Sequence, residues 1–151
     1  MREAINAALQ RAVAEGKKGR AATLRLIQAT IRDRDAQARE AGGEGVGDDD
    51  VLEILHKMLK QREQSTREYE EAGQVGLAEQ EREESDIIRE FLPRQLSEKE
   101  VRGICEEVVR DINAHGLRDM GRCMNALKQR FPGQMDFTQA SCVVKDLLRT
   151  H

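Results

Sequence analysis

Residues 97–112 read SEKEVRGICEEVVRDI, and they carry the clearest helical period in the chain. Apolar side chains recur at alternating intervals of three residues and one, at Val101, Ile104, Cys105, Val108, Val109 and Ile112. This spacing places them on one face of a helix. Ser97 and Glu100 stand at the start in the pattern of a capping box, and Gly116 closes the segment. The stretch therefore predicts an amphipathic helix.

The same pattern continues on both sides and predicts seven helices and no strand. The other six helices are expected over about residues 5–16, 20–41, 51–72, 75–92, 119–131 and 136–148. Asp50 with Glu53, Asp119 and Asp136 are the expected N-terminal caps. The run Glu79–Asp86 contains no apolar residue, so this part of its helix is expected to stand in water.

Pro93 marks the expected boundary between two helical domains, because proline disrupts a helix interior. Residues 1–93 would hold four helices and residues 94–151 three. The composition agrees, since the 151 residues include 3% aromatic side chains, two Pro and no Trp. Sheets are enriched in aromatic and β-branched residues, so a sandwich or barrel is disfavoured and the expected fold class is all-α.

Composition also bears on location. Mean hydropathy is −0.69, and no apolar run approaches the roughly 20 residues that span a bilayer. The first residues lack the apolar core of a secretory leader. Cys105, Cys123 and Cys142 are odd in number, form no CxxC pair and fall on apolar faces, so we expect buried free thiols. Together these features predict a cytoplasmic protein without a membrane span.

The net charge of −3 is unevenly distributed. Residues 1–39 carry +5, residues 40–92 carry −10 and residues 93–151 carry +2. A polyanion such as RNA is attracted to the first and last segments and repelled by the middle one.

A search for catalytic, cofactor or metal motifs yields little. The glycine-rich run 43–47 follows no strand, lacks a Lys-Ser/Thr pair and leads into three Asp, which disfavours a phosphate loop and favours a flexible loop. Glu53 and His56 have the Glu-x-x-His spacing, but a di-iron bundle needs two such motifs. No nucleophile can be matched with a base. We therefore expect no catalytic residue, cofactor or metal.

Basic residues are the remaining candidates. One group comprises Lys17, Lys18, Arg25 and Arg32, and the other comprises Arg118, Arg122, Lys128 and Arg130. They can be parts of solvated faces of mixed charge or a patch that contacts phosphates. Asp119 lies close enough to Arg122 to neutralise part of the second group. Base stacking is not expected, because exposed aromatic residues are nearly absent.

Several strings in a fixed order resemble the GatB/YqeY family of small bacterial proteins over essentially the whole chain. These strings are LRLIQA at 24–29 with DRD at 33–35, KQREQS at 60–65 with YEEAG at 69–73, AEQE at 78–81, EFLPRQLS at 90–97, DMGRCM at 119–124 and GQMD at 133–136. The resemblance implies a two-part helical fold.

The resemblance also implies a function for residues 94–151. They look like the tail domain of GatB, a component of the glutamine-dependent aspartyl/glutamyl-tRNA amidotransferase, and that domain helps to hold tRNA. The match is carried by residues 121–128 and 143–148. Gly121, early in its helix, would let an RNA backbone or another helix approach closely. The implied partners are tRNA and a translation-related protein.

Family members also carry a label of carbon–nitrogen ligase activity with glutamine as amido donor. Such chemistry needs a nucleotide and metal site and an activated nucleophile, and no residues here match them. The sequence therefore favours a tRNA-associated module without its own catalytic site. The ligase label would then come from the likeness to the tail domain and not from chemistry carried out by this chain. The alternative is a protein–protein adaptor that uses the acidic segment 40–92 to dock a basic partner.

Overall fold

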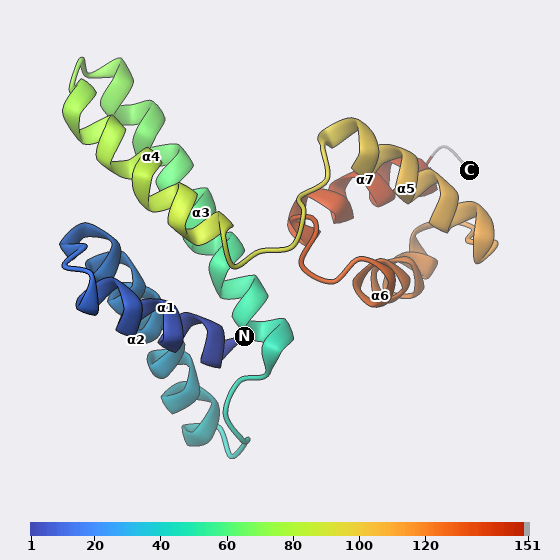
Figure 1. Cartoon of the computed structure of the whole chain (residues 1–151). Coiled ribbons are helices and arrows are strands. Elements are labelled where there is room, and N and C mark those ends of the chain that lie inside the picture. The colour runs from blue at the N-terminus through green and yellow to red at the C-terminus, as the bar shows by residue number, and fades with distance from the viewer. Residues whose placement is uncertain (150–151) are drawn as a thin grey trace. The chain divides into compact units, whose positions relative to one another are not determined.

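A computed structural model describes residues 1–149 of the chain. These residues form seven α-helices and a short 3-10 helix, and none forms a strand, so the all-α expectation is confirmed (Figure 1). The elements are α1 (Arg2–Ala14), α2 (Lys18–Glu40), α3 (Asp48–Glu71), α4 (Val75–Arg89), α5 (Glu98–Asp111), η1 (Leu117–Asp119), α6 (Met120–Arg130) and α7 (Phe137–Arg149). No helix in this part of the chain is both long and apolar enough to cross a membrane.

The helices divide into two compact units, one spanning Met1–Leu92 and the other beginning at Pro93. The first unit contains α1–α4 and the second contains α5–α7, which is compatible with the expected arrangement of four and three helices. Each unit has its own cluster of buried apolar side chains, and no residue belongs to both clusters.

In the first unit, α1 pairs with α2 and α3 pairs with α4 (Figure 1). Apolar residues at helical spacing bring the two pairs together in one core. Its most deeply buried large side chains are Ile5, Leu24, Ile27, Val51, Ile54, Leu55 and Ile88. This core fixes the orientation of α2, so the opposite side of α2 faces solvent.

The apolar core ends at Leu59 on α3 and Ile87 on α4. We call residues 60–86, beyond that point, the α3–α4 arm. The buried side chains of the arm are Thr66, Ala78 and Ser85. Each buried hydroxyl donates to a carbonyl of its own helix, at 2.7 Å from Thr66 and 2.9 Å from Ser85. The expectation that 79–86 stands wholly in water is therefore wrong for one face, which packs on α3.

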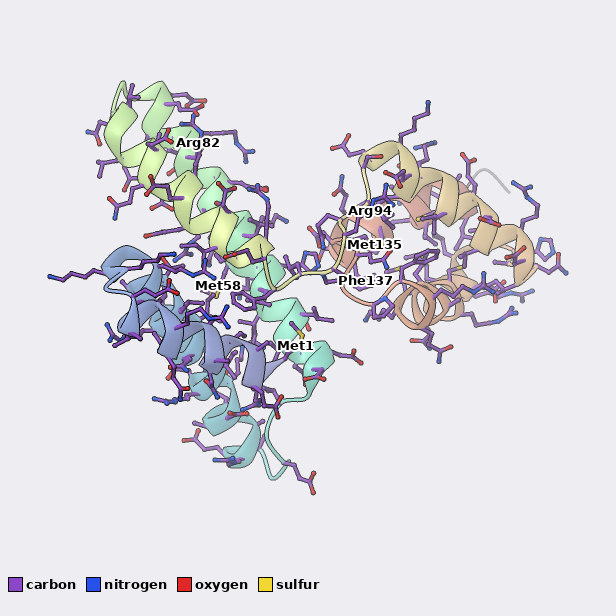
Figure 2. The ribbon with its side chains drawn as sticks, viewed as in Figure 1. Met1, Met58, Arg82, Arg94, Met135 and Phe137 are labelled. Carbon is purple, nitrogen blue, oxygen red and sulfur yellow. The ribbon has the colours of Figure 1, made fainter. Side chains whose placement is uncertain are left out.

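Ion pairs join the two helices of the arm. Arg62 Nε lies 3.5 Å from Glu84 Oε2, and Arg82 pairs with Glu70. Arg82 is labelled on the arm in Figure 2. Burial and the neighbouring Glu84 raise the pKa of Glu81. The arm is thus held mainly by polar contacts, which contribute less than an apolar core of similar length.

The turn between α3 and α4 ends α3 in the expected way. Gly73 has φ 74°, and the amide of Gln74 donates to the carbonyl of Tyr69 at 2.8 Å. This left-handed glycine fits the C′ position of a helix end. Val75 and Leu77 follow at the tip, where they are 69% and 44% exposed.

In the second unit, α5, α6 and α7 surround a core of small and medium side chains. The fully buried members include Cys105, Val108, Cys123, Leu127, Ala140 and Val144. The chain before α5 is fastened to the turn before α7, because the amide of Leu96 donates to the carbonyl of Gln134 at 2.9 Å. Gln95 Nε2 also donates to the carbonyl of Gly133 at 2.8 Å.

Of the four expected helix caps, two are confirmed and two are wrong. Ser97 and Glu100 form the capping box of α5, with the amide of Glu100 donating to Ser97 Oγ at 3.1 Å. Asp136 accepts from the amide of Thr138 at 3.0 Å. The expected box of Asp50 with Glu53 is wrong, because α3 begins at Asp48 and Asp50 accepts from the amide of Gly47.

Asp119 does not cap α6 through its side chain, contrary to expectation. Its carboxylate accepts instead from the backbone amide of His115 at 2.7 Å. That contact holds the turn between α5 and η1, and it lowers the pKa of Asp119, with Arg122 adding to the effect. Local sequence spacing does not predict this, because the turn folds back onto the carboxylate.

The expectation of three buried thiols holds for Cys105 and Cys123 but is wrong for Cys142, which is exposed. Cys142 lies on α7, where Ala140, Val144 and Leu148 form the buried face. Burial raises the pKa of the Cys105 thiol to about 11 and also raises that of Cys123. Both buried thiols are therefore protonated at neutral pH and behave as small apolar side chains.

Candidate nucleic-acid interface

Three basic residues form a row along the solvent face of α2. Lys18, Arg25 and Arg32 are seven residues apart, and seven residues are close to two helical turns. All three side chains are exposed, and within residues 1–149 none has an ion-pair partner. We call these three residues the α2 row. Their charges are available to an external anion.

Two neighbouring cations are already engaged by carboxylates. Lys17 Nζ lies 3.1 Å from Glu15 Oε2, and Arg20 pairs with Glu90 at the end of α4. The structure therefore separates Lys17, which the sequence groups with the α2 row, from the three cations without partners.

A small recess opens beside Arg32, between α1 and α2. Its volume is about 110 Å³, with Ile5 and Ile31 among its lining residues. Two side-chain amides, those of Asn6 and Gln28, line it as well. Gln28 Nε2 donates to Asn6 Oδ1, which leaves the Asn6 amino group and the Gln28 carbonyl oxygen for other partners.

A buried carboxylate organises the loop between α2 and α3. Asp35 is 7% exposed and accepts two bonds from Arg2, at 2.6 and 2.7 Å. It also accepts from the amide of Val46 at 2.9 Å, while Arg2 donates to the Val46 carbonyl. These donors hold the pKa of Asp35 far below its usual range. We call this group the Asp35 latch.

The latch explains one residue of the glycine-rich run. A Cβ at Gly45 would lie 2.8 Å from Asp35 Oδ1, closer than a Cβ atom approaches another heavy atom. The glycine lets the loop pass over the carboxylate. The glycine-rich run thus connects α2 and α3, as expected, and it is held to an internal carboxylate through Val46.

The second candidate group lies on and around α6, and half of its cations are engaged. Arg122 donates to Asp119 at 3.3 Å and to the carbonyl of Ile112 at 2.9 Å. Arg130 pairs with Asp111 at 3.0 Å. Arg118 is exposed and, among the described residues, has no ion-pair partner. The ammonium of Lys128 stands 5.9 Å from the ring centroid of Phe137.

Gly121 lies between the two cations that no carboxylate engages. Gly121 follows Arg118 by three residues and precedes Lys128 by seven. At these spacings, Arg118, Gly121 and Lys128 lie on one side of α6 and of the 3-10 helix before it. A Cβ added at Gly121 would meet no heavy atom within 4 Å. No helix in the described part of the second unit packs against this glycine, so packing within that unit does not account for it. We call Arg118, Gly121 and Lys128 the α6 face.

The sequence matches a protein-family model described as Yqey-like protein over residues 2–148. The chain belongs to the YqeY-like family. A search of curated proteins found no match. Because the family match spans both units, membership describes the whole chain and not one domain. The likeness of residues 94–151 to the amidotransferase tail rests on the sequence strings alone.

In this YqeY-like chain, the structure adds residues that the sequence does not single out. Asn6 and Gln28 look like ordinary polar surface residues in sequence and meet only when α1 folds onto α2. Arg2 and Asp35 are 33 residues apart, and no local spacing connects them. Within residues 1–149, no group of three His, Cys, Asp or Glu is placed to hold a metal ion.

Proposed function

We propose that this YqeY-like protein is a tRNA-associated accessory module without a catalytic site of its own. The observation that carries the proposal is the α6 face, where Gly121 has no neighbour over it and two cations not paired with carboxylates flank it. It belongs to the unit that resembles the tRNA-holding tail.

The physical argument concerns close approach. A glycine without neighbours lets a sugar–phosphate backbone come nearer to the helix than any other residue would. Arg118 and Lys128 can then neutralise phosphates on either side and release their counterions. Arg122 and Arg130 contribute less, because carboxylates already engage them.

The test is binding of the purified full chain to total tRNA, compared with single-stranded DNA of matched charge, at about 50 and 150 mM salt. We expect a preference for tRNA that persists at the higher salt. Replacing Arg118 and Lys128 by Gln should weaken binding. The matched control replaces Arg122 and Arg130 by Gln, which removes the same net charge from paired positions.

A larger loss in the control pair than in the test pair would place the contact elsewhere. Equal binding of tRNA and DNA would mean that the basic residues belong to a solvated surface of mixed charge and form no tRNA site. For the ligase label, we expect the protein neither to bind ATP nor to hydrolyse glutamine. Measurable turnover of glutamine would overturn the proposal that the chain lacks a catalytic site.

One observation favours the adaptor as a second candidate. Val75 and Leu77 expose apolar surface at the tip of the acidic α3–α4 arm. Deleting residues 40–92 would remove core residues such as Val51 and Leu55, so the deletion would not isolate the arm. The suitable variant is Val75→Ser with Leu77→Ser, which should abolish capture of a basic partner while tRNA binding is unchanged.

A further inference from the structure

We propose that the α2 row and the recess beside it contact the sugar–phosphate backbone of base-paired RNA. This extends the proposed function to a second surface, in the other unit and on different residues. The argument rests on three observations: the spacing of cations that have no ion-pair partner within residues 1–149, the amides of the recess and the absence of aromatic residues from α1 and α2.

No carboxylate stands between the ends of the row. Residues 18–32 contain no Asp or Glu, and the first acidic residue after the row is Asp33. Lys18 and Arg32 are 14 positions apart on α2, which corresponds to roughly 21 Å along the helix axis at 1.5 Å per residue. A straight row of this length can follow a nucleic-acid backbone over several phosphates.

The recess adds groups that suit a ribose. Asn6 keeps a free amino donor and Gln28 a free carbonyl acceptor after their mutual hydrogen bond. A ribose 2′-hydroxyl both donates and accepts hydrogen bonds, and it is the group by which proteins distinguish RNA from DNA. Arg32 lines the same recess, so a phosphate beside that ribose would meet a cation.

The kind of RNA follows from what this surface lacks. Residues 1–47 contain no Phe, Tyr or Trp. Single-stranded nucleic acids are usually held by stacking bases on aromatic rings, and neither α1 nor α2 provides one; Phe91 of the same unit is partly buried against the core. Double-stranded RNA is recognised mainly through phosphates and 2′-hydroxyls. The α2 surface therefore fits base-paired RNA without sequence preference.

The experiment titrates the full chain with a 16-base-pair RNA duplex and with the DNA duplex of the same sequence, over a series of salt concentrations. We expect tighter binding to RNA. Replacing Lys18, Arg25 and Arg32 together by Gln should lower the slope of log Kobs against log salt by about 2 to 3, since each lost phosphate contact lowers it by roughly 0.7–0.9.

The matched control replaces Lys17, Arg82 and Arg89 by Gln. It removes the same net charge, but from cations that are paired with carboxylates. A second variant, Gln28→Glu, places a carboxylate beside Arg32 and should reduce the preference for RNA over DNA. Thermal unfolding of each variant checks that the fold is retained.

A duplex slope that falls equally in the test and control triples would overturn the inference, as would equal affinity for RNA and DNA. Either result leaves the proposed function standing if Arg118→Gln with Lys128→Gln still weakens tRNA binding. Conversely, a loss confined to the α2 triple on the duplex, with no effect of the α6 pair on tRNA, supports the α2 surface and rejects the α6 face.

Discussion

At the scale of single residues, the molecule separates cations that have carboxylate partners from those that do not. Arg122 and Arg130 look identical to Arg118 in sequence, yet two of them are held by Asp119 and Asp111. The charge available to a partner is therefore smaller than the count of basic residues suggests. Within residues 1–149, the cations without a carboxylate partner include the α2 row and the two basic residues of the α6 face.

Gly121→Ala should change stability and binding in opposite directions. The position is helical and has open space, so alanine should stabilise the fold by about 0.4–1 kcal/mol through its higher helix propensity. If a backbone approaches there, the new methyl group should weaken tRNA binding. Thermal unfolding and tRNA titration measure the two effects, and a stabilised variant with unchanged affinity would contradict the close approach.

Asp35→Asn should destabilise the protein most near neutral pH and progressively less as the pH falls below about 4. The latch holds the pKa of Asp35 below its unfolded value, mainly through Arg2. Its contribution is fully present above the unfolded carboxyl pKa of about 4, and it is lost as the pH falls further. The gap between the melting temperatures of the two proteins should be constant from pH 7 to about pH 5 and should narrow progressively from there to pH 2; a constant gap over the whole range would show that charge is not the cause.

At the scale of elements, local signals predict the helices well where the deciding contacts are local. The capping box of Ser97 with Glu100 needs only four consecutive residues, and the structure confirms it. The sequence pattern assigns Asp119 to the wrong partner because the His115 amide reaches it through a turn. Of the candidate site, the sequence identifies the cations and the local pair of Arg122 with Asp119, which the structure confirms. It does not identify the partner of Arg130, because Asp111 lies on another helix.

Ser97→Ala should lower the free energy of unfolding by about 1 kcal/mol, because it leaves the backbone amide of Glu100, in the first turn of α5, without its acceptor. Helicity measured by circular dichroism during thermal unfolding reports the change. Ser141→Ala on α7 is a suitable control, since the Ser141 hydroxyl bonds only within its own helix. Equal effects of the two substitutions would argue against a capping role.

The α3–α4 arm should open locally before the core of its unit unfolds. Exposed ion pairs contribute about 0–1 kcal/mol each, and the arm has few buried apolar groups to supplement them. Amide hydrogen exchange should therefore be faster over residues 62–84 than over residues 51–59. Equal protection of amides from exchange along the whole of α3 would contradict local opening and would show that polar contacts stabilise the arm as well as the apolar core stabilises the rest.

At the scale of the whole molecule, the two cores share no residue. Leu127→Ala should remove about 2–5 kcal/mol from the second unit, because Leu127 is fully buried there. In NMR spectra of this variant, we expect the backbone amide chemical shifts to change for residues after Pro93 and to stay the same for residues before it. Leu24→Ala should have the converse effect and change only the shifts of the first unit. Unfolding of both units in either variant would show that the stabilities of the two units are strongly coupled.

The single Tyr of the chain gives the arm an optical reporter. Tyr69 lies half-buried on α3 within the arm, and the sequence contains no Trp to mask its emission. Intrinsic fluorescence therefore observes the arm alone, whereas circular dichroism observes every helix. An emission change at a lower temperature than the loss of ellipticity would follow the opening of the arm directly, with no label attached.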